Sequence, residues 1–258
     1  MSKRVRIIPV LSIIEGQLVK TVGFKNPKYL GDPINAIKIL NDKEVDEIVL
    51  VDIRASQKNS PINYTLLKEM AGECFMPLAY GGGVNSFSQT EKIFSLGVEK
   101  IILNSALESN PELISEVASV YGQQSVVAAL DFKKNIFGKY KLYFKSGSTT
   151  CKNNYLEYIK QLIDRGVGEL IVTDISKEGT FSGYNNELLS IISEAVNVPV
   201  VANGGCSGLK NMLDVCKNAG CSAASAGSLF VYRNNDPRSI LINYPTEEFK
   251  KKTIFEKF

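Results

Sequence analysis

This sequence predicts a closed (β/α)8 barrel, a TIM barrel, built from two duplicated half-barrels. Three observations lead to that fold class. The chain repeats itself at about half its length, eight short apolar segments alternate with amphipathic ones, and glycines follow matching apolar segments in both halves. Each observation is taken in turn below.

The repeat covers most of the chain. Three segments of the first half return in the same order in the second half, at an interval of 122 or 123 positions: Val45–Ile53 as Val167–Ile175, Met76–Gly83 as Val198–Gly205, and Gly97–Ser105 as Gly220–Ser228. Solenoid repeats recur every ~20–50 residues, so an interval this long indicates a duplicated half-domain. Because no linker rich in Pro, Gly or Ser separates the halves, we expect residues 1–258 to form a single domain.

Eight apolar segments have the pattern of buried parallel strands, since most are rich in β-branched residues and apolar on both faces. In chain order they are Arg6–Leu11, Glu47–Ile53, Pro77–Tyr80, Lys100–Leu103, Val126–Leu130, Glu169–Thr173, Val198–Ala202 and Ser222–Ala226.

The segments between these strands have the apolar spacing of helices with one buried face. They are Pro33–Leu40, Tyr64–Glu73, Ser86–Leu96, Pro111–Tyr121, Asn154–Arg165, Asn186–Ala195 and Leu209–Ala219. Several end in a residue that favours a helix C-cap, namely Gly97, Gly166, Asn197 and Gly220. Strand and helix alternating in this way predict a TIM barrel, and the repeat supplies four units in each half.

Composition excludes several classes of function. Thirty basic and 27 acidic residues give a net charge of +3, with no basic block of five or more, so we expect no nucleic-acid partner. No stretch of 18 apolar residues exists, so we expect no membrane partner and a cytoplasmic protein. The five cysteines form no CxxC pair, and we expect free thiols, no metal and no cofactor.

The chain contains no histidine. The commonest general base, the commonest metal ligand and any Ser-His-Asp triad are therefore excluded. Catalysis must use carboxylates, Lys, Tyr, hydroxyls or backbone N–H groups.

The active site of such a barrel lies at the C-terminal ends of its strands. There, glycines follow the third and seventh predicted strands, and hydroxyls follow the fourth and eighth. Glycine lets backbone N–H groups approach an anion closely, and a helix N-terminus adds its dipole. Tight turns alone would explain one such pair, but two matching pairs favour a ligand with a phosphate at both ends. The candidates are Gly82, Gly83, Asn104 and Ser105 in the first half, and Asn203, Gly204, Gly205, Gly227 and Ser228 in the second.

Four charged residues stand at the N-terminal starts of strands, namely Arg6, Glu47, Lys100 and Glu169. Exposed charges at loop ends are the ordinary interpretation. However, Glu47 and Glu169 occupy the same site in each half, and charges that point into a barrel must be paired to be tolerated. We therefore expect a neutral ring of four that acts as a gate.

Together these residues resemble the cyclase subunit of imidazole glycerol phosphate synthase (HisF) over essentially the full chain. The resemblance rests on the segments 6–11, 19–20, 31–33, 52–56, 81–83 and 179–184, and on Asp131. It implies a glutaminase partner (HisH-like) at the N-terminal face, from which ammonia passes the charged gate to a bis-phosphorylated substrate at the C-terminal face. It also adds Gly179 and Thr180 to the phosphate-binding residues and places Lys20 on the mobile loop after the first strand.

One departure from the family bears on catalysis. The family uses two aspartates as general acid and base; Asp131 matches the second, but Ser12 stands where the first belongs. A neutral serine hydroxyl cannot replace a carboxylate in proton transfer. This combination is similar to a paralogous branch, found with surface-polysaccharide genes, that supplies ammonia for converting an acetamido group on a nucleotide-linked sugar to an acetamidino group.

Three functions remain open from the sequence. The first is a HisF-like synthase subunit for such sugar amidation, acting on a phosphorylated small molecule. The second is a genuine cyclase of histidine biosynthesis that tolerates Ser12. The third is a non-catalytic scaffold that activates the glutaminase.

Overall fold

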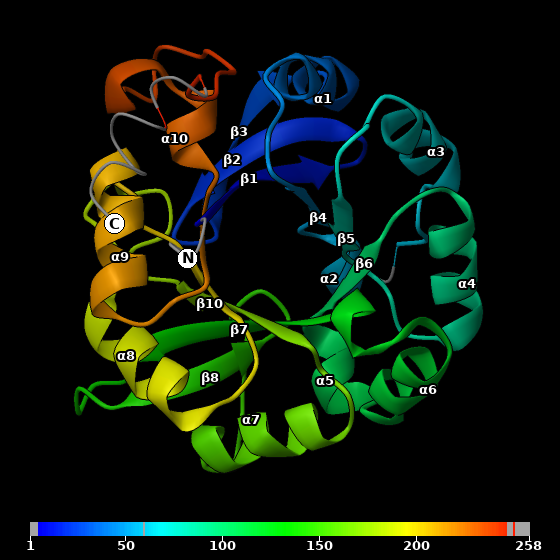
Figure 1. The fold of residues 1–258 in the computed structure, drawn as a ribbon, viewed down its shortest axis with the longest axis vertical. Coiled ribbons are helices and arrows are strands. Elements are labelled where there is room, and N and C mark those ends of the chain that lie inside the picture. The colour runs from blue at the N-terminus through cyan, green and yellow to red at the C-terminus, as the bar shows by residue number, and fades with distance from the viewer. Residues whose placement is uncertain (1–4, 59, 247–249, 251–258) are drawn as a thin grey trace.

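The computed structural model describes residues 5–58, 60–246 and 250. Eight parallel strands form a closed barrel surrounded by helices (Figure 1). Around the barrel they are β1 (Arg6–Ile14), β4 (Ile48–Asp52), β5 (Leu78–Gly81), β6 (Lys100–Leu103), β7 (Val126–Lys134), β10 (Glu169–Asp174), β11 (Val200–Asn203) and β12 (Ala223–Ala226). Parallel pairing of β1 with β12 closes the ring, which confirms the predicted (β/α)8 fold.

The helices follow the strands as predicted and cover the outside of the barrel (Figure 1). The longer ones are α1 (Pro33–Asp42), α3 (Tyr64–Gly72), α4 (Phe87–Ser95), α6 (Glu112–Tyr121), α7 (Tyr155–Asp164), α8 (Asn186–Ala195) and α9 (Leu209–Asn218). Side chains of Asp32, Asn63, Asn154 and Asn185 accept backbone N–H groups at the starts of α1, α3, α7 and α8, which satisfies donors that the helix leaves unpaired.

Short helices follow three strands as well. They are α2 (Ala55–Lys58), α5 (Ser105–Ser109) and α10 (Ser228–Val231), and the 3-10 turns η1 (Gln123–Ser125) and η2 (Arg233–Asn235) lie elsewhere in the chain. Among the described residues, no helix is both long and apolar enough to cross a membrane.

The apolar core has two layers. The larger one lies between strands and helices. The smaller one fills the inside of the barrel with one buried side chain from each of its eight strands: Ile8, Val49, Ala79, Ile102, Val127, Ile171, Val201 and Ala223. Both faces of every barrel strand are therefore buried, which explains why these segments are apolar throughout.

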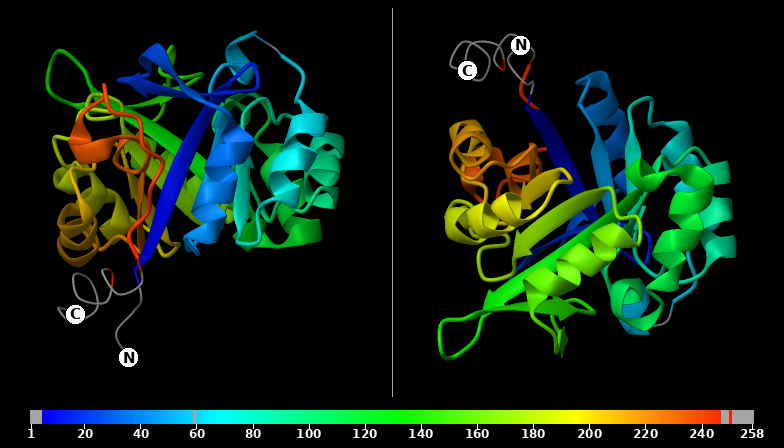
Figure 2. Two further views of the ribbon diagram at one scale, coloured as in Figure 1. Left: turned by 90° about the horizontal axis from the view of Figure 1, so that it is seen from above. Right: turned by 60° about the horizontal axis from the view of Figure 1, so that its bottom comes forward.

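Two β-hairpins correct the sequence prediction. The first and fifth predicted strands were expected to end at residues 11 and 130, but β1 and β7 each run for nine residues. Each then pairs antiparallel with the next strand, β1 with β2 (Gln17–Val22) and β7 with β8 (Tyr140–Phe144). Strands β3 (Lys25–Gly31) and β9 (Thr149–Thr150) extend these additions. Both hairpins lie on the side of the barrel away from the N-terminus (Figure 2).

Candidate functional site

A cavity of about 480 Å³ opens at the C-terminal ends of the barrel strands. Almost every residue predicted for the site lines it, although these residues come from all parts of the chain. Lining it are Ser12, Lys20, Gly82, Gly83, Asn104, Ser105, Asp131, Gly179, Asn203, Gly204, Gly205, Gly227 and Ser228. The cavity reaches down to Val49, Ile102 and Ile171, which belong to the apolar layer inside the barrel.

Asp131 is a buried carboxyl group that lines this cavity, as is Glu178. Asp131 follows Val127 and Ala129 among the side chains of β7 that point into the barrel. The Asn104 side-chain amide donates to Asp131 Oδ2 at 3.2 Å and to the Ala129 carbonyl at 3.0 Å. Burial raises the pKa of Asp131 to about 7, and a hydrogen bond from Thr173 acts against that shift. A carboxyl group with a pKa near neutrality can both accept and return a proton at physiological pH.

Ser12 lies on β1, which stands opposite β7 in the barrel order, and it lines the same cavity half-buried. Its backbone is paired with Val51 of β4 on one side and Val19 of β2 on the other. The positions that the resemblance assigns to the family's two aspartates therefore face one cavity. Only one of them carries a carboxylate in this chain.

The residues predicted for the first phosphate seat lie after β5 and β6. Gly82 has a φ of 117°, and a Cβ there would lie 2.5 Å from the Asp52 carbonyl oxygen, so only glycine fits. Ser105 begins α5, but Asn104 uses its side chain on Asp131 and accepts the Lys145 N–H at 3.0 Å. The role of Asn104 in this structure is therefore to position Asp131 and the hairpin after β7.

The residues predicted for the second seat lie after β10, β11 and β12. Gly179, Gly204, Gly205 and Gly227 bring backbone to the cavity wall, and Ser228 presents a buried hydroxyl that has no hydrogen-bond partner. A buried hydroxyl without a partner is costly unless a ligand or water satisfies it.

Thr180, which the resemblance adds to the phosphate-binding residues, has its side chain turned toward its own loop. It is exposed, lies outside the cavity lining, and its hydroxyl donates to the Lys177 carbonyl at 2.7 Å. The hydroxyl also lies 2.7 Å from that of Ser182. Thr180 therefore shapes the loop after β10 and does not contact the cavity.

Lys20 was expected on a loop, but it lies buried in strand β2. Its ammonium group contacts the Glu178 carboxylate and donates to the Thr21 carbonyl at 3.0 Å. Gly23 at the hairpin tip also donates its N–H to the Glu178 carbonyl at 2.9 Å. Burial lowers the pKa of Lys20, while the adjacent carboxylate favours the charged form. These contacts with Glu178 thus join the first hairpin to the loop after β10 at the cavity.

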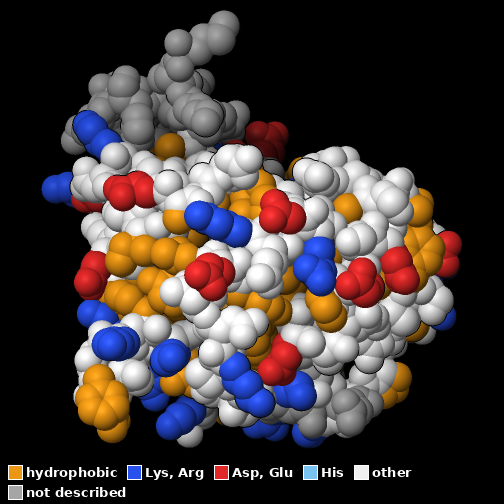
Figure 3. All heavy atoms as spheres, turned by 90° about the horizontal axis from the view of Figure 1, so that it is seen from below, with side chains coloured by type: hydrophobic (Ala, Val, Ile, Leu, Met, Phe, Trp, Pro, Cys, Tyr) orange, Lys and Arg blue, Asp and Glu red, His pale blue; other side chains and the backbone are white. Residues whose placement is uncertain are grey.

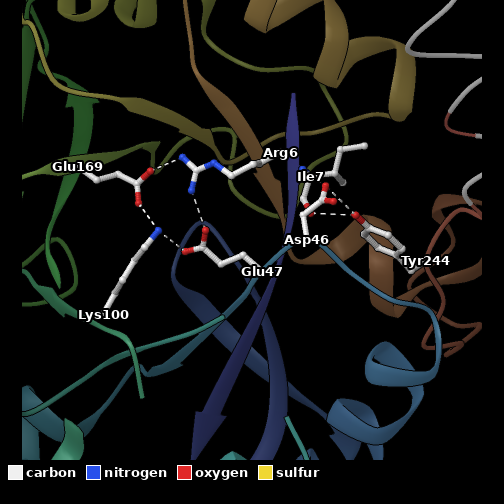
Figure 4. A network of polar contacts seen from close by, with 7 residues as sticks. All are labelled: Arg6, Ile7, Asp46, Glu47, Lys100, Glu169 and Tyr244. Carbon is white, nitrogen blue, oxygen red and sulfur yellow. Dashed lines mark hydrogen bonds and ion pairs between the residues drawn. The ribbon is translucent and has the colours of Figure 1, made fainter. Parts of the chain in front are cut away.

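The four charged residues at the other end of the barrel form a closed ring (Figure 4). Arg6 Nη1 lies 2.7 Å from Glu47 Oε2, and its Nη2 contacts Glu169 Oε1. Lys100 Nζ lies 2.8 Å from Glu47 Oε1 and 2.8 Å from Glu169 Oε2. Burial alone would raise the pKa of Glu169, but the charges of Lys100 and Arg6 outweigh it and hold that pKa below its ordinary value.

One apolar layer separates this ring from the cavity. Val49, Ile102 and Ile171 each follow a ring residue by two positions along the chain, so their side chains point the same way one layer higher. The barrel axis therefore runs from a neutral ring of charges, past small and branched apolar side chains, to a polar cavity. That sequence of surroundings suits a small uncharged molecule better than an ion.

The comparisons with known proteins agree with this architecture. A family model described as "Histidine biosynthesis protein" matches residues 6–236. The chain belongs to that family. A Pseudomonas aeruginosa (strain PAO1) protein is 45% identical over 242 residues, covering 94% of this chain and 96% of that protein. It is named imidazole glycerol phosphate synthase subunit hisF2, with the assignment marked as provisional in its name.

A second relative carries the same subunit name without that mark. It is the imidazole glycerol phosphate synthase subunit HisF of Lactococcus lactis subsp. cremoris (strain MG1363), 38% identical over 228 residues, with 88% of each protein covered. The chain is therefore a HisF-like subunit, and the proteins it resembles are cyclase-type enzyme subunits.

Two contributors to this HisF-like site were not predicted from the sequence. Thr173 lies beside Asp131 in the β7–β10 register, and its hydroxyl accepts a hydrogen bond from the Asn203 side-chain amide at 3.0 Å. The second is Glu178, whose carboxylate contacts the Lys20 ammonium group of the first hairpin. The alternation of inward positions on β10, from Glu169 to Ile171 to Thr173, would have identified Thr173.

Asp52 and Asp174, which match each other in the repeat, have structural roles in the HisF-like barrel. Asp52 Oδ1 accepts the N–H groups of Arg54 and Ala55, and Asp174 Oδ1 accepts that of Ser176 at 2.9 Å. Both carboxylates therefore hold the turn that follows their strand. In the described parts of the chain, no cluster of His, Cys, Asp or Glu is arranged to hold a metal ion, and all five cysteines are free.

Proposed function

We propose that this chain is the ammonia-using subunit of an amidotransferase pair that modifies a nucleotide-linked sugar of a surface polysaccharide. A glutaminase partner would dock at the N-terminal face, beside the charge ring, and release ammonia into the barrel. The chain would use that ammonia at the C-terminal cavity to convert an acetamido group to an acetamidino group. The observation that carries the proposal is Ser12, which faces Asp131 across an otherwise HisF-like site.

The ring and the apolar layer support the ammonia route. Ammonia is neutral and small, so it can cross an apolar layer that excludes ammonium. Passage would require the Lys100 or Arg6 contacts to open briefly, because the ring closes the barrel floor in this structure.

The cavity supports the chemistry through Asp131. With a pKa near 7, Asp131 is suited to take a proton from ammonia as it adds to the substrate carbon, while the Asn104 amide holds the carboxylate in place. One of the two phosphate seats would hold the diphosphate of a nucleotide sugar. The amide oxygen must leave for an amidine to form, so a third enzyme that activates the amide is part of the proposal.

Ser12 argues against the cyclase reaction as the main activity. That reaction uses a carboxylate at this position in the family, and loss of a general acid or base costs ~10²–10⁴-fold in rate. The cyclase nevertheless remains the second candidate function, because a relative 38% identical to this chain bears the unqualified HisF name.

One experiment separates the candidates. The purified chain is given the bis-phosphorylated formimino-ribonucleotide of histidine biosynthesis with saturating ammonium, beside a Ser12→Asp variant, and turnover is followed by absorbance. We expect substrate binding without turnover in the natural chain and a gain of activity in Ser12→Asp. Turnover at ordinary enzyme rates by the natural chain would make it a cyclase and refute the amidation proposal.

A second comparison tests the scaffold alternative. Asp131→Asn is introduced into the gene, and the acetamidino content of the polysaccharide is measured in cells. The amidation function predicts loss of the acetamidino product, whereas a scaffold that only activates the glutaminase predicts an unchanged output.

A further inference from the structure

The β7–β8 hairpin displays two large apolar side chains to solvent at its tip. Ile136 is 93% exposed and Phe137 is 78% exposed. The tip is a well-bonded turn: Asn135 Oδ1 accepts the N–H groups of Phe137 and Lys139, both at 3.0 Å. The Asn135 N–H donates to the Lys139 carbonyl at 2.9 Å, and the Gly138 N–H donates to the Asn135 carbonyl at 3.0 Å. The backbone therefore holds these side chains outward in a defined turn.

Lysines surround this tip. The segment 132–150 contains five of them, Lys133, Lys134, Lys139, Lys141 and Lys145, and neither Asp, Glu nor Arg. The exposed pair thus sits in a segment of charge +5. One carboxylate from another part of the chain contacts this segment: Glu187 of α8 pairs with Lys134 at 3.1 Å.

The first hairpin repeats this composition on the same face of the molecule (Figure 2). The segment 17–31 contains no Asp, Glu or Arg, and its Lys25 and Lys28 are exposed, whereas Lys20 is buried against Glu178. Val22 and Tyr29 in it are 51% and 58% exposed. Lys and Arg side chains gather along the lower edge in Figure 3, the side on which both hairpins lie. Both hairpins border the cavity, through Lys25 and Ser146 among others.

We propose that this face docks on an anionic lipid surface, with Ile136 and Phe137 inserted among the lipids and the lysines against their head groups. A convex apolar tip beside basic residues can enter the boundary between head groups and acyl chains. Each lysine held near an anionic surface strengthens binding by roughly fivefold. The cavity mouth would then face the membrane.

The choice of lysine favours lipid over a protein partner. Protein interfaces are enriched in arginine and depleted of lysine, because the guanidinium group makes defined paired hydrogen bonds. Lysine acts as a point charge, which suffices for a fluid layer of phosphate groups. Both hairpins use lysine alone as their cation.

This proposal revises the sequence-based expectation of no membrane partner. That expectation rested on the lack of an 18-residue apolar stretch, which docking on a lipid surface does not require. Antiparallel pairing sets Lys133 directly opposite Lys141, so folding brings lysines that are eight positions apart in sequence to one surface.

Because the chain contains no tryptophan, Phe137→Trp supplies a single fluorescent probe at the tip. The variant is mixed with vesicles of phosphatidylcholine plus phosphatidylglycerol, or of phosphatidylcholine alone, and its emission is recorded. We expect a blue shift with the anionic vesicles only. The matched control is Phe75→Trp, at a residue that is 83% exposed in the loop before β5, on the opposite face; its emission should not move.

Vesicle flotation of the full chain tests the same surface. Ile136→Ser with Phe137→Ser should weaken binding by roughly 10–100-fold. Lys139→Glu with Lys141→Glu should weaken it by at least about 25-fold. The matched control, Lys43→Glu with Lys68→Glu, reverses two exposed charges away from the hairpins and should have much less effect. Thermal unfolding of each variant verifies that it is folded.

Three results would overturn the proposal. They are failure of the natural chain to bind anionic vesicles, equal binding to neutral ones, and binding that the hairpin variants leave unchanged. A blue shift of Phe137→Trp that depends on protein concentration without vesicles would assign the tip to contact between protein chains instead. None of these results depends on the proposed sugar amidation, so the two proposals fail separately.

Discussion

Two buried carboxyl groups of this barrel titrate in opposite directions because their neighbours differ. Asp131 receives hydrogen bonds from neutral groups, and burial raises its pKa to about 7. For Glu169, burial would also raise the pKa, but contacts with Lys100 and Arg6 lower it. The first group is therefore suited to proton transfer, and the second to a permanent charge pair.

The raised pKa of Asp131 makes stability depend on pH. Between the unfolded value of 3.8 and the folded value of about 7, the folded state binds the proton more tightly, so stability should fall as pH rises through this range. Asp131→Asn should remove that loss and stabilise the chain at pH 8 by roughly 2–4 kcal/mol. Urea unfolding at pH 5 and pH 8 measures it. A gain that is the same at both pH values would show that Asp131 has an ordinary pKa.

Removing one member of the charge ring should be costly. Lys100→Met leaves Glu47 and Glu169 facing each other with Arg6 alone, and a buried pair broken on one side typically costs about 3–5 kcal/mol. Lys38→Met is the control, since its contact with Glu73 at 3.3 Å is exposed and should contribute less than about 1 kcal/mol. Equal effects of the two substitutions on urea unfolding would mean that the ring is fully hydrated.

At the scale of elements, the sequence predicts the buried ones well and the exposed ones poorly. The barrel strands are identified by continuous apolar runs, because both of their faces are buried. The two hairpins extend past the barrel and are partly exposed, so their strands mix lysines with apolar residues. They therefore lack the continuous apolar run that identifies a barrel strand. The turn at Asn135 and Gly138 and the alternation over Tyr140–Phe144 were the available signals.

The same distinction holds within the site. Glycines and Asp131 could be predicted because the ends of parallel strands meet at one face. The fastening of Lys20 by Glu178 could not, since it joins residues 158 positions apart through a hairpin that the sequence did not predict.

The turn after β5 should tolerate no side chain at Gly82. An alanine there would have to adopt a φ of 117° and would place its Cβ 2.5 Å from the Asp52 carbonyl oxygen. We expect Gly82→Ala to destabilise the chain by at least about 2 kcal/mol and to weaken inorganic phosphate binding at the first seat. Gly72→Ala is the matched control, with open space around it at the end of α3, and should be neutral or stabilising. Unchanged phosphate affinity in a folded Gly82→Ala would remove this turn from the site.

At the scale of the whole molecule, both halves of the repeat contribute residues to the same site. Asn104 of the first half holds Asp131 of the second at 3.2 Å. The charge ring takes Arg6, Glu47 and Lys100 from the first half and Glu169 from the second. Neither half contains a complete site, so the function requires the closed barrel.

This division predicts that the two halves, residues 1–122 and 123–258, should assemble when produced together. Each half alone leaves two barrel strands without one of their neighbouring strands, β1 and β6 in the first and β7 and β12 in the second. Their pairing restores both junctions, and Glu169 supplies the anion that Arg6 and Lys100 need. Size-exclusion chromatography should therefore show a complex of the size of the intact chain, with cooperative thermal unfolding.

The ring should contribute most of the electrostatic preference for that assembly. Glu169→Lys in the second fragment puts a third cation against Arg6 and Lys100 and should weaken assembly by about 100-fold or more. Glu187→Lys, in the same fragment, disrupts only an exposed contact with Lys134 and serves as the matched control. Fragments that assemble equally well with either substitution would show that strand pairing and apolar burial alone close the barrel, and that the ring is free to serve passage through its floor.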